Sequence, residues 1–135
     1  MAQQPTIESA MTPFPYSVEA DAHASSARTM MTQLNIRHLP VREGETLVGV
    51  LSDWGLRRAA ELGLDVSSGG EARVRDVCSK EVLAVAPEEP LANVLTLMAE
   101  KHVETVLVVR NGKLAGIFTV TDACKRYADL LRKPG

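Results

Sequence analysis

A threonine and an aspartate stand three residues apart, at the point where a short apolar run gives way to a helical pattern. Thr119 follows the run 114–118, and Asp122 opens the helical pattern. A carboxylate at such a junction can accept charge-assisted hydrogen bonds from a pair of ribose hydroxyls. The Thr119 hydroxyl and the amides at the start of the helix can meet a phosphate. The simpler alternative is that Asp122 only caps the helix, which contributes about 1 kcal/mol of stability.

The other reactive side chains form no recognisable catalytic or metal-binding set. There is no Ser-His-Asp or Cys-His grouping and no phosphate-cradling glycine loop, and neither His23 nor His102 has companions at ligand spacing. Cys78 and Cys124 are too few for a disulfide framework, suit a reducing compartment and are expected to be small buried residues. We therefore expect no enzyme activity, no cofactor and no metal, and a cytoplasmic location.

The composition is that of an ordinary globular chain. Of 135 residues, 45% are hydrophobic and 24% charged, which argues against disorder. A net charge of −2 provides no electrostatic attraction to nucleic acid or to anionic lipid, and 4% aromatic residues do not favour a surface for stacking single strands. No apolar run approaches the roughly 18 residues of a membrane span, and the amino end lacks the pattern of a signal peptide.

Two copies of one pattern fill the chain, at an offset of 116 − 49 = 67 residues. Gly49 and Gly116 each lie within an apolar run, and this offset aligns the two halves without a gap. The matched pairs include Thr12 with Ser79, Met31 with Met98, Val41 with Val108, Leu47 with Leu114 and Ser52 with Thr119. We interpret the pattern as two copies of one supersecondary unit.

Within each copy the hydrophobic periods change in the same order. Apolar residues at steps of three and four predict a helix from Ala24 to Leu34 and another from Leu91 to Met98, and Asp21 is predicted to cap the first. Two β-branched-rich runs and a second helix follow, and Asn111-Gly112 predicts a tight hairpin turn. The expected strands and second helices are 36–41, 46–51 and 54–62 in copy one, and 103–109, 114–118 and 122–131 in copy two.

The predicted fold class is therefore α+β, with each copy running strand, helix, strand, strand, helix. A copy of this size buries too little apolar surface to be stable alone. We expect the two copies to pack about a pseudo-two-fold axis and to leave clefts between them. The predicted boundaries are 7–62 for the first domain, 63–73 for a Gly- and Ser-rich linker, and 74–132 for the second domain.

The order of these motifs resembles that of cystathionine-β-synthase (CBS) domains. The residues that carry the resemblance are Ala10-Met11-Thr12-Pro13, Ile36-Arg37-His38-Leu39-Pro40-Val41 and Leu47-Val48-Gly49-Val50-Leu51-Ser52, with Gly116-Ile117-Phe118-Thr119-Val120-Thr121-Asp122 in the second copy. Two copies in register are similar to a CBS pair, or Bateman module, over 7–132. The resemblance implies a regulatory module that binds an adenosine-containing ligand, such as AMP, ADP, ATP or S-adenosylmethionine, between the repeats. It also implies a homodimer of pairs acting on an effector protein.

The resemblance further implies a set of binding residues around Asp122. Apolar side chains such as Ile36, Val103 and Ile117 would form the walls for a purine. The implied ligand-binding residues are Thr12, Tyr16, Ser17, Ile36, Arg37, His38, Thr105, Ile117, Thr119 and Asp122. Arg37 is equally well explained as a solvated surface charge, and His38 is better explained as a structural or surface histidine.

The matching site of the first copy departs from the pattern. Ser52 corresponds to Thr119, but Gly55 stands where Asp122 would be, and Asp53 is displaced by two positions. Trp54 corresponds to Thr121, and its ring could close the cleft or stack on a base. We therefore expect one nucleotide per chain. The alternative function is a structural or protein-interaction module that binds no nucleotide.

Overall fold

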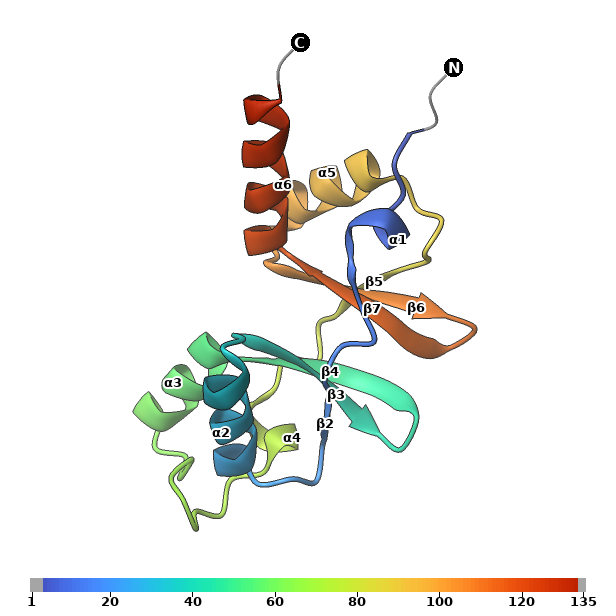
Figure 1. Cartoon of the computed structure of the whole chain (residues 1–135). Coiled ribbons are helices and arrows are strands. Elements are labelled where there is room, and N and C mark those ends of the chain that lie inside the picture. Colours follow the sequence, from blue (N-terminus) through green and yellow to red (C-terminus); the bar gives the residue numbers. More distant parts are fainter. Residues whose placement is uncertain (1–3, 134–135) are drawn as a thin grey trace. The chain divides into compact units, whose positions relative to one another are not determined.

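Residues 4–133 are described here from a computed structural model of the chain (Figure 1). They form two compact units. Unit 1 combines the residues up to Pro15 with those from Leu83 onward, and unit 2 comprises Tyr16–Val82. Each unit consists of one β-sheet with its helices on one side, as Figure 1 shows for each unit taken by itself.

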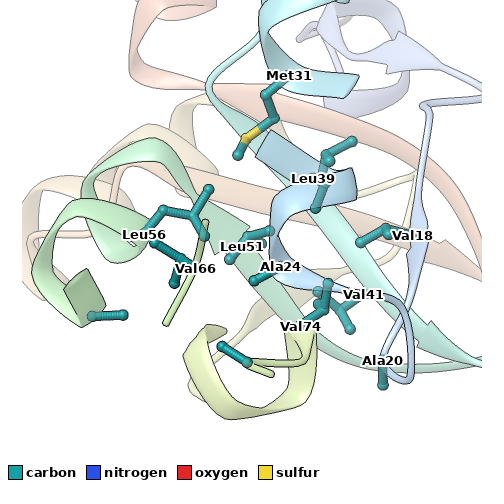
Figure 2. Packing of buried hydrophobic residues seen from close by; sticks show 13 residues of the cluster. Val18, Ala20, Ala24, Met31, Leu39, Val41, Leu51, Leu56, Val66 and Val74 are labelled. Carbon is teal, nitrogen blue, oxygen red and sulfur yellow. The ribbon is translucent and has the colours of Figure 1, made fainter. Parts of the chain in front are cut away.

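Unit 2 has a three-stranded sheet in the order β2-β3-β4. Its elements are β2 (Val18–Glu19), α2 (Ala24–Leu34), β3 (His38–Glu43), β4 (Thr46–Ser52), α3 (Asp53–Glu61) and α4 (Val74–Val77). Strand β2 is parallel to β3, and β3 forms an antiparallel hairpin with β4. Apolar residues alternate along the hairpin, so that Leu39, Val41 and Leu51 face the helices and form a core with Ala24 and Leu56 (Figure 2).

Unit 1 has a four-stranded sheet in the order β1-β7-β6-β5. Its elements are α1 (Ile7–Ala10), β1 (Thr12–Pro13), β5 (Leu83–Val85), α5 (Leu91–Lys101), β6 (Thr105–Arg110), β7 (Lys113–Thr119) and α6 (Val120–Arg132). Val106, Val108 and Phe118 face the helices and pack with Ile7 and Val94. The hairpin turn has positive φ at Asn111 (53°) and Gly112 (77°), as the Asn-Gly sequence predicts.

The opening segment of each sequence repeat packs into the unit that contains the hairpin of the other repeat. Strand β1 pairs with β7, with Thr12 opposite Ile117. In unit 2 the equivalent residue Ser79 exchanges two backbone hydrogen bonds of 2.9 Å with Val50. The compact units therefore do not follow the boundaries of the sequence repeats.

The two glycines that define the repeat are required by these close approaches. A Cβ at Gly49 would lie 2.6 Å from the Ser79 carbonyl oxygen, and a Cβ at Gly116 would overlap the thioether of Met11. At Gly49 the obstacle is backbone, so only a residue without a side chain allows the exchanged segment to approach its strand so closely; at Gly116 it is the flexible end of a side chain.

The strand, helix, strand, strand, helix order is present in both repeats, and one local prediction needs correction. Asp21 does not cap α2: the N-cap is His23, and the Asp21 carboxylate instead accepts a hydrogen bond from Arg75 at 2.7 Å. The segment 63–73 lies inside unit 2, where Val66 and Ala72 are 5% and 6% exposed and belong to its core. The segment predicted as a linker thus contributes Val66 and Ala72 to the unit 2 core, while its residues Gly63, Ser67, Ser68 and Gly69 are exposed.

Candidate functional site

Thr119 and Asp122 join strand β7 to helix α6 through a capping box. The Thr119 backbone N–H and hydroxyl both donate to Asp122 Oδ2, at 2.9 and 3.0 Å, and the Asp122 N–H donates to Thr119 Oγ1 at 3.3 Å. The capping role of Asp122 is therefore present in the structure. The other carboxylate oxygen, Oδ1, has no hydrogen-bond partner in the described part of the chain, so capping leaves it available to a ligand.

Four of the predicted residues share one face of the unit 1 sheet. Thr105 lies opposite Thr119 in the β6–β7 register, and Thr12 lies opposite Ile117 in the β1–β7 register. Because side chains alternate along a strand, these residues are on the face opposite to Phe118, which belongs to the helix-side core. The structure thus brings together, on one face and at its α6 end, half of the predicted site.

The Thr105 hydroxyl is buried without a partner. Within residues 4–133 its Oγ1 is the buried side-chain oxygen or nitrogen that forms no hydrogen bond. Buried polar atoms are almost always paired, and leaving one unpaired costs about 1–3 kcal/mol. An unpaired hydroxyl directly opposite Thr119 is therefore a position at which a bound polar group would be stabilised.

The other five predicted residues belong to unit 2. Ser17 already accepts a hydrogen bond from Arg42 Nε at 2.6 Å, and Ile36 packs in part against the unit 2 core. Tyr16 and Arg37 are exposed, and the Arg37 carbonyl accepts the Asp53 N–H at 2.9 Å. Ser17, Ile36 and Arg37 therefore have local contacts within unit 2.

His38 is the fifth of these residues. It is half-buried and begins β3, in register with Ser52. This is the place that Thr105 occupies opposite Thr119 in unit 1. The two hairpins therefore present different side chains at equivalent positions.

The first-copy counterpart of the capping box lacks its carboxylate. Ser52 Oγ accepts the Gly55 N–H at 2.9 Å, which reproduces half of the box. Asp53, which is displaced by two positions from the place of Asp122, instead forms an ion pair with Arg57 at 2.8 Å. Trp54 is 70% exposed and is not folded into the unit 2 core.

The cysteines and the remaining ligand-type residues do not form a further site. Cys78 is half-buried, and desolvation raises the pKa of its thiol, with the nearby Lys80 charge opposing the shift. Cys124 is exposed, contrary to the expectation of burial. In the part of the chain that the structure describes, no three His, Cys, Asp or Glu side chains gather as a metal site would require. No helix between residues 4 and 133 is both long and apolar enough to span a bilayer.

Unit 1 carries an apolar hollow that was not predicted from the sequence. It has a volume of about 650 Å³ and lies over α5 and α6. Its lining includes Leu91, Leu95, Val120, Cys124, Tyr127 and Leu130, with Arg126, Asp129 and Lys133 around them. The signal was present as leucine and tyrosine at helical spacing in α6, which buries no residue within unit 1.

A second missed feature is Phe14, two residues after the predicted ligand residue Thr12. Its φ is 49° and its side chain is 92% exposed. The available signal was a phenylalanine between two prolines, Pro13 and Pro15.

Comparison with known proteins identifies the family. The model of the CBS domain matches the chain twice, over residues 7–62 and 74–129. The chain belongs to the CBS domain family. YlbB of Bacillus subtilis is 30% identical over 98 residues, which cover 71% of this chain and 64% of YlbB, so the chain spans less than two thirds of that relative.

Solved CBS structures share the fold over nearly the whole chain. AcuB from Vibrio cholerae superposes with a TM-score of 0.83 and 27% identity, covering 96% of this chain and 94% of AcuB. CBSX2, solved in complex with AMP, superposes with a TM-score of 0.75 and 25% identity, covering 94% of this chain and 98% of CBSX2. The α+β fold with two CBS repeats is therefore confirmed.

Proposed function

We propose that this CBS pair is a ligand-sensing regulatory module that binds an adenosine-containing nucleotide at Thr119 and Asp122. One observation carries the proposal. The capping box fixes the Asp122 carboxylate through Oδ2 and leaves Oδ1 without a partner in the described chain. Because the group is already oriented, it can accept the ribose hydroxyls without losing further side-chain freedom.

Two neighbouring features support the same ligand. The Thr105 hydroxyl, buried and unpaired opposite Thr119, can bond to a ribose or phosphate oxygen. Ile117 provides an apolar surface on the same face of the sheet. CBSX2, which is 25% identical to this chain, was solved with AMP, a ligand of the proposed class.

Regulation requires that the ligand bind one conformation of the protein better than another. Only such a difference in affinity lets nucleotide concentration change the contacts of the module with an effector protein. We infer a cytoplasmic setting from the two free thiols, Cys78 and Cys124, and we expect no turnover of the nucleotide.

We also propose a homodimer that forms through the hollow on unit 1. Helix α6 buries none of its residues within unit 1, and Tyr127, Leu130 and Leu131 are each more than 60% exposed. Arg126 and Asp129 lie at the same hollow, so a two-fold axis there can place opposite charges against each other. A second copy of this chain is therefore the occupant that this face fits.

Light scattering after size exclusion tests the dimer. Leu130→Glu should convert dimer to monomer because it places a charge in the apolar contact. Leu62→Glu is the matched control, since Leu62 is a similarly exposed helix-end leucine of unit 2. A monomeric wild type, or an equal effect of both substitutions, would contradict the proposed interface.

Thermal unfolding against AMP, ADP, ATP and S-adenosylmethionine tests the ligand. A ligand at about 100 times its dissociation constant adds about 2.7 kcal/mol to the free energy of unfolding, a clear rise in Tm. A rise with at least one of the four supports the proposal. No rise with any of them at millimolar concentration would sink it.

The second candidate function is a protein-interaction module without a nucleotide. The observation that favours it is the incomplete capping box at Ser52 and Gly55. Helix α3 begins there without a carboxylate that could bind a ligand. An unchanged Tm with every nucleotide, combined with a stable dimer, would select this function.

A further inference from the structure

Phe14 has a conformation and an exposure that packing does not explain. Positive φ is unfavourable for a residue with a Cβ, and bulky residues adopt it rarely. Proline at position 15 restricts Phe14 further, since a residue before proline favours extended backbone. Yet the ring is 92% exposed, so no core contact accounts for the strained backbone. Strain of this kind collects at functional positions.

The surroundings hold this backbone firmly in place. Pro13 pairs with Gly116 at the end of β1, and the Phe14 N–H donates to the Ala115 carbonyl at 3.2 Å. Two flanking prolines limit the φ angles on both sides of Phe14. The Phe14 ring thus extends from a fixed backbone at the edge of the unit 1 sheet, and its flat apolar faces are exposed to solvent.

The matching position of the other repeat lacks this feature. At the offset of 67, Phe14 corresponds to Glu81, whose φ is not positive. Phe14 therefore follows the strand, β1, that pairs with β7, and β7 ends at the complete Thr119–Asp122 capping box. Its counterpart lies in unit 2, with the incomplete site.

The distance along the sheet limits what the ring can contact. Phe14 is bonded to Ala115, four residues before Thr119 on β7, which corresponds to about 13 Å along the strand. In a mononucleotide the base is attached directly to the ribose, so a ribose held at Asp122 keeps its base near the α6 end of the sheet. A ring this far along the edge fits a second aromatic group, joined to the adenosine through phosphates.

We propose that Phe14 is a specificity-determining residue that stacks on the second base of a dinucleotide whose adenosine is held at Thr119 and Asp122. This inference rests on the proposed function and names the ligand class more closely. The ligand is an adenosine dinucleotide, and the phosphates between its two nucleosides span the strand between Thr119 and Ala115. Stacking of an aromatic side chain on a base is worth about tenfold in affinity or more.

Calorimetric titration with four probes tests the inference: AMP and ATP as mononucleotides, and NAD and diadenosine tetraphosphate as dinucleotides. Wild type should bind at least one dinucleotide about tenfold more tightly than AMP or ATP. Phe14→Ala should abolish that preference and leave the affinity for AMP unchanged. Phe14→Tyr keeps a ring and should retain the preference, and Trp54→Ala, which removes an exposed ring of unit 2, should have no effect.

The contrary outcomes separate the two levels of the proposal. Equal affinities of wild type for all four probes, or an equal loss of affinity for all four in Phe14→Ala, would overturn the dinucleotide inference while nucleotide binding stands. A change of oligomeric state in Phe14→Ala with unaltered ligand preference would assign the ring to a protein contact instead. Absence of binding by all four probes would overturn the proposed function itself.

Discussion

The two repeats use the same junction between a strand and a helix, but with different chemistry. In unit 1, Thr119 and Asp122 form both halves of a capping box, whereas in unit 2, Ser52 and the Gly55 amide form only one half. Helices α3 and α6 both begin directly after their N-cap residues, so the Asp122 carboxylate is not required for the fold. The fold forms without a carboxylate at Gly55, but at the matching position Asp122 is held in place with its Oδ1 unpaired in the described chain. Ligand binding is the best explanation for this difference.

The largest expected effect is that of Asp122→Ala on ligand affinity. Two charge-assisted hydrogen bonds to the ribose would be lost, each worth about 1.5–3 kcal/mol, so affinity should fall at least about a hundredfold. The free energy of unfolding should fall only by the share of the cap, about 0.5–2 kcal/mol. Calorimetry and denaturant unfolding measure the two quantities separately.

Glu100→Ala is the control for this substitution, because Glu100 is an exposed carboxylate on helix α5 of the same unit, outside the hollow. It should leave nucleotide affinity unchanged. Retained affinity in Asp122→Ala would place the ligand elsewhere.

The glycines of the two repeats should differ in their tolerance of a methyl group. Gly49→Ala drives a Cβ against the backbone carbonyl of Ser79, whereas Gly116→Ala meets the flexible thioether of Met11. We expect Gly49→Ala to cost about 1–3 kcal/mol of unfolding free energy and Gly116→Ala to cost less, because a side chain can move aside and a paired backbone cannot. Urea unfolding of the two variants decides, and the reverse order would refute this explanation.

Gly55→Asp should bring the unit 2 site closer to the unit 1 site. Its Cβ would lie 3.1 Å from Ser52 Oγ, so a small shift of that hydroxyl is needed before a complete box can form. If the carboxylate is what the site lacks, calorimetric stoichiometry should rise from one to two nucleotides per chain. Unaltered stoichiometry, with a folded variant, would show that Trp54 or another residue also blocks the site.

The smallest expected effect is that of Thr105→Val. Removal of an unpaired buried hydroxyl should leave the free energy of unfolding unchanged or raise it slightly, while nucleotide affinity should fall severalfold, as for one lost hydrogen bond of about 0.5–1.5 kcal/mol. Ser52→Ala, at the incomplete site, should not weaken nucleotide binding. A loss of stability in Thr105→Val without a loss of affinity would make the hydroxyl structural.

The regular elements and the capping pair could be predicted from the sequence because their causes are local. Apolar spacing placed α2 and α5, and Asn111-Gly112 placed the hairpin turn. The packing of each opening segment into the unit with the other repeat's hairpin could not be predicted. It depends on contacts between residues far apart in the chain, such as Met11, which packs against Gly116 where a Cβ would otherwise lie. The same holds for Asp21, which does not cap α2 as expected but accepts a hydrogen bond from the distant Arg75.

The candidate site could be predicted only in part, for a related reason. Residue type and offset were enough to predict Thr119 and Asp122 as candidates and to predict that Asp122 caps its helix. The missing hydrogen-bond partner of Thr105 depends on strand pairing, which no local pattern encodes. The two prolines beside Phe14 mark an irregular segment but do not predict its positive φ. The five predicted residues of unit 2 remain a prediction.

The most direct test of nucleotide binding at the complete box is a crystal structure of the chain with the nucleotide that raises Tm most. We predict one nucleotide per chain, with its ribose hydroxyls within hydrogen-bond distance of Asp122 Oδ1 and none at Ser52. A ribose bound at Ser52 and Gly55, or a nucleotide that leaves Asp122 without contact, would contradict the central claim.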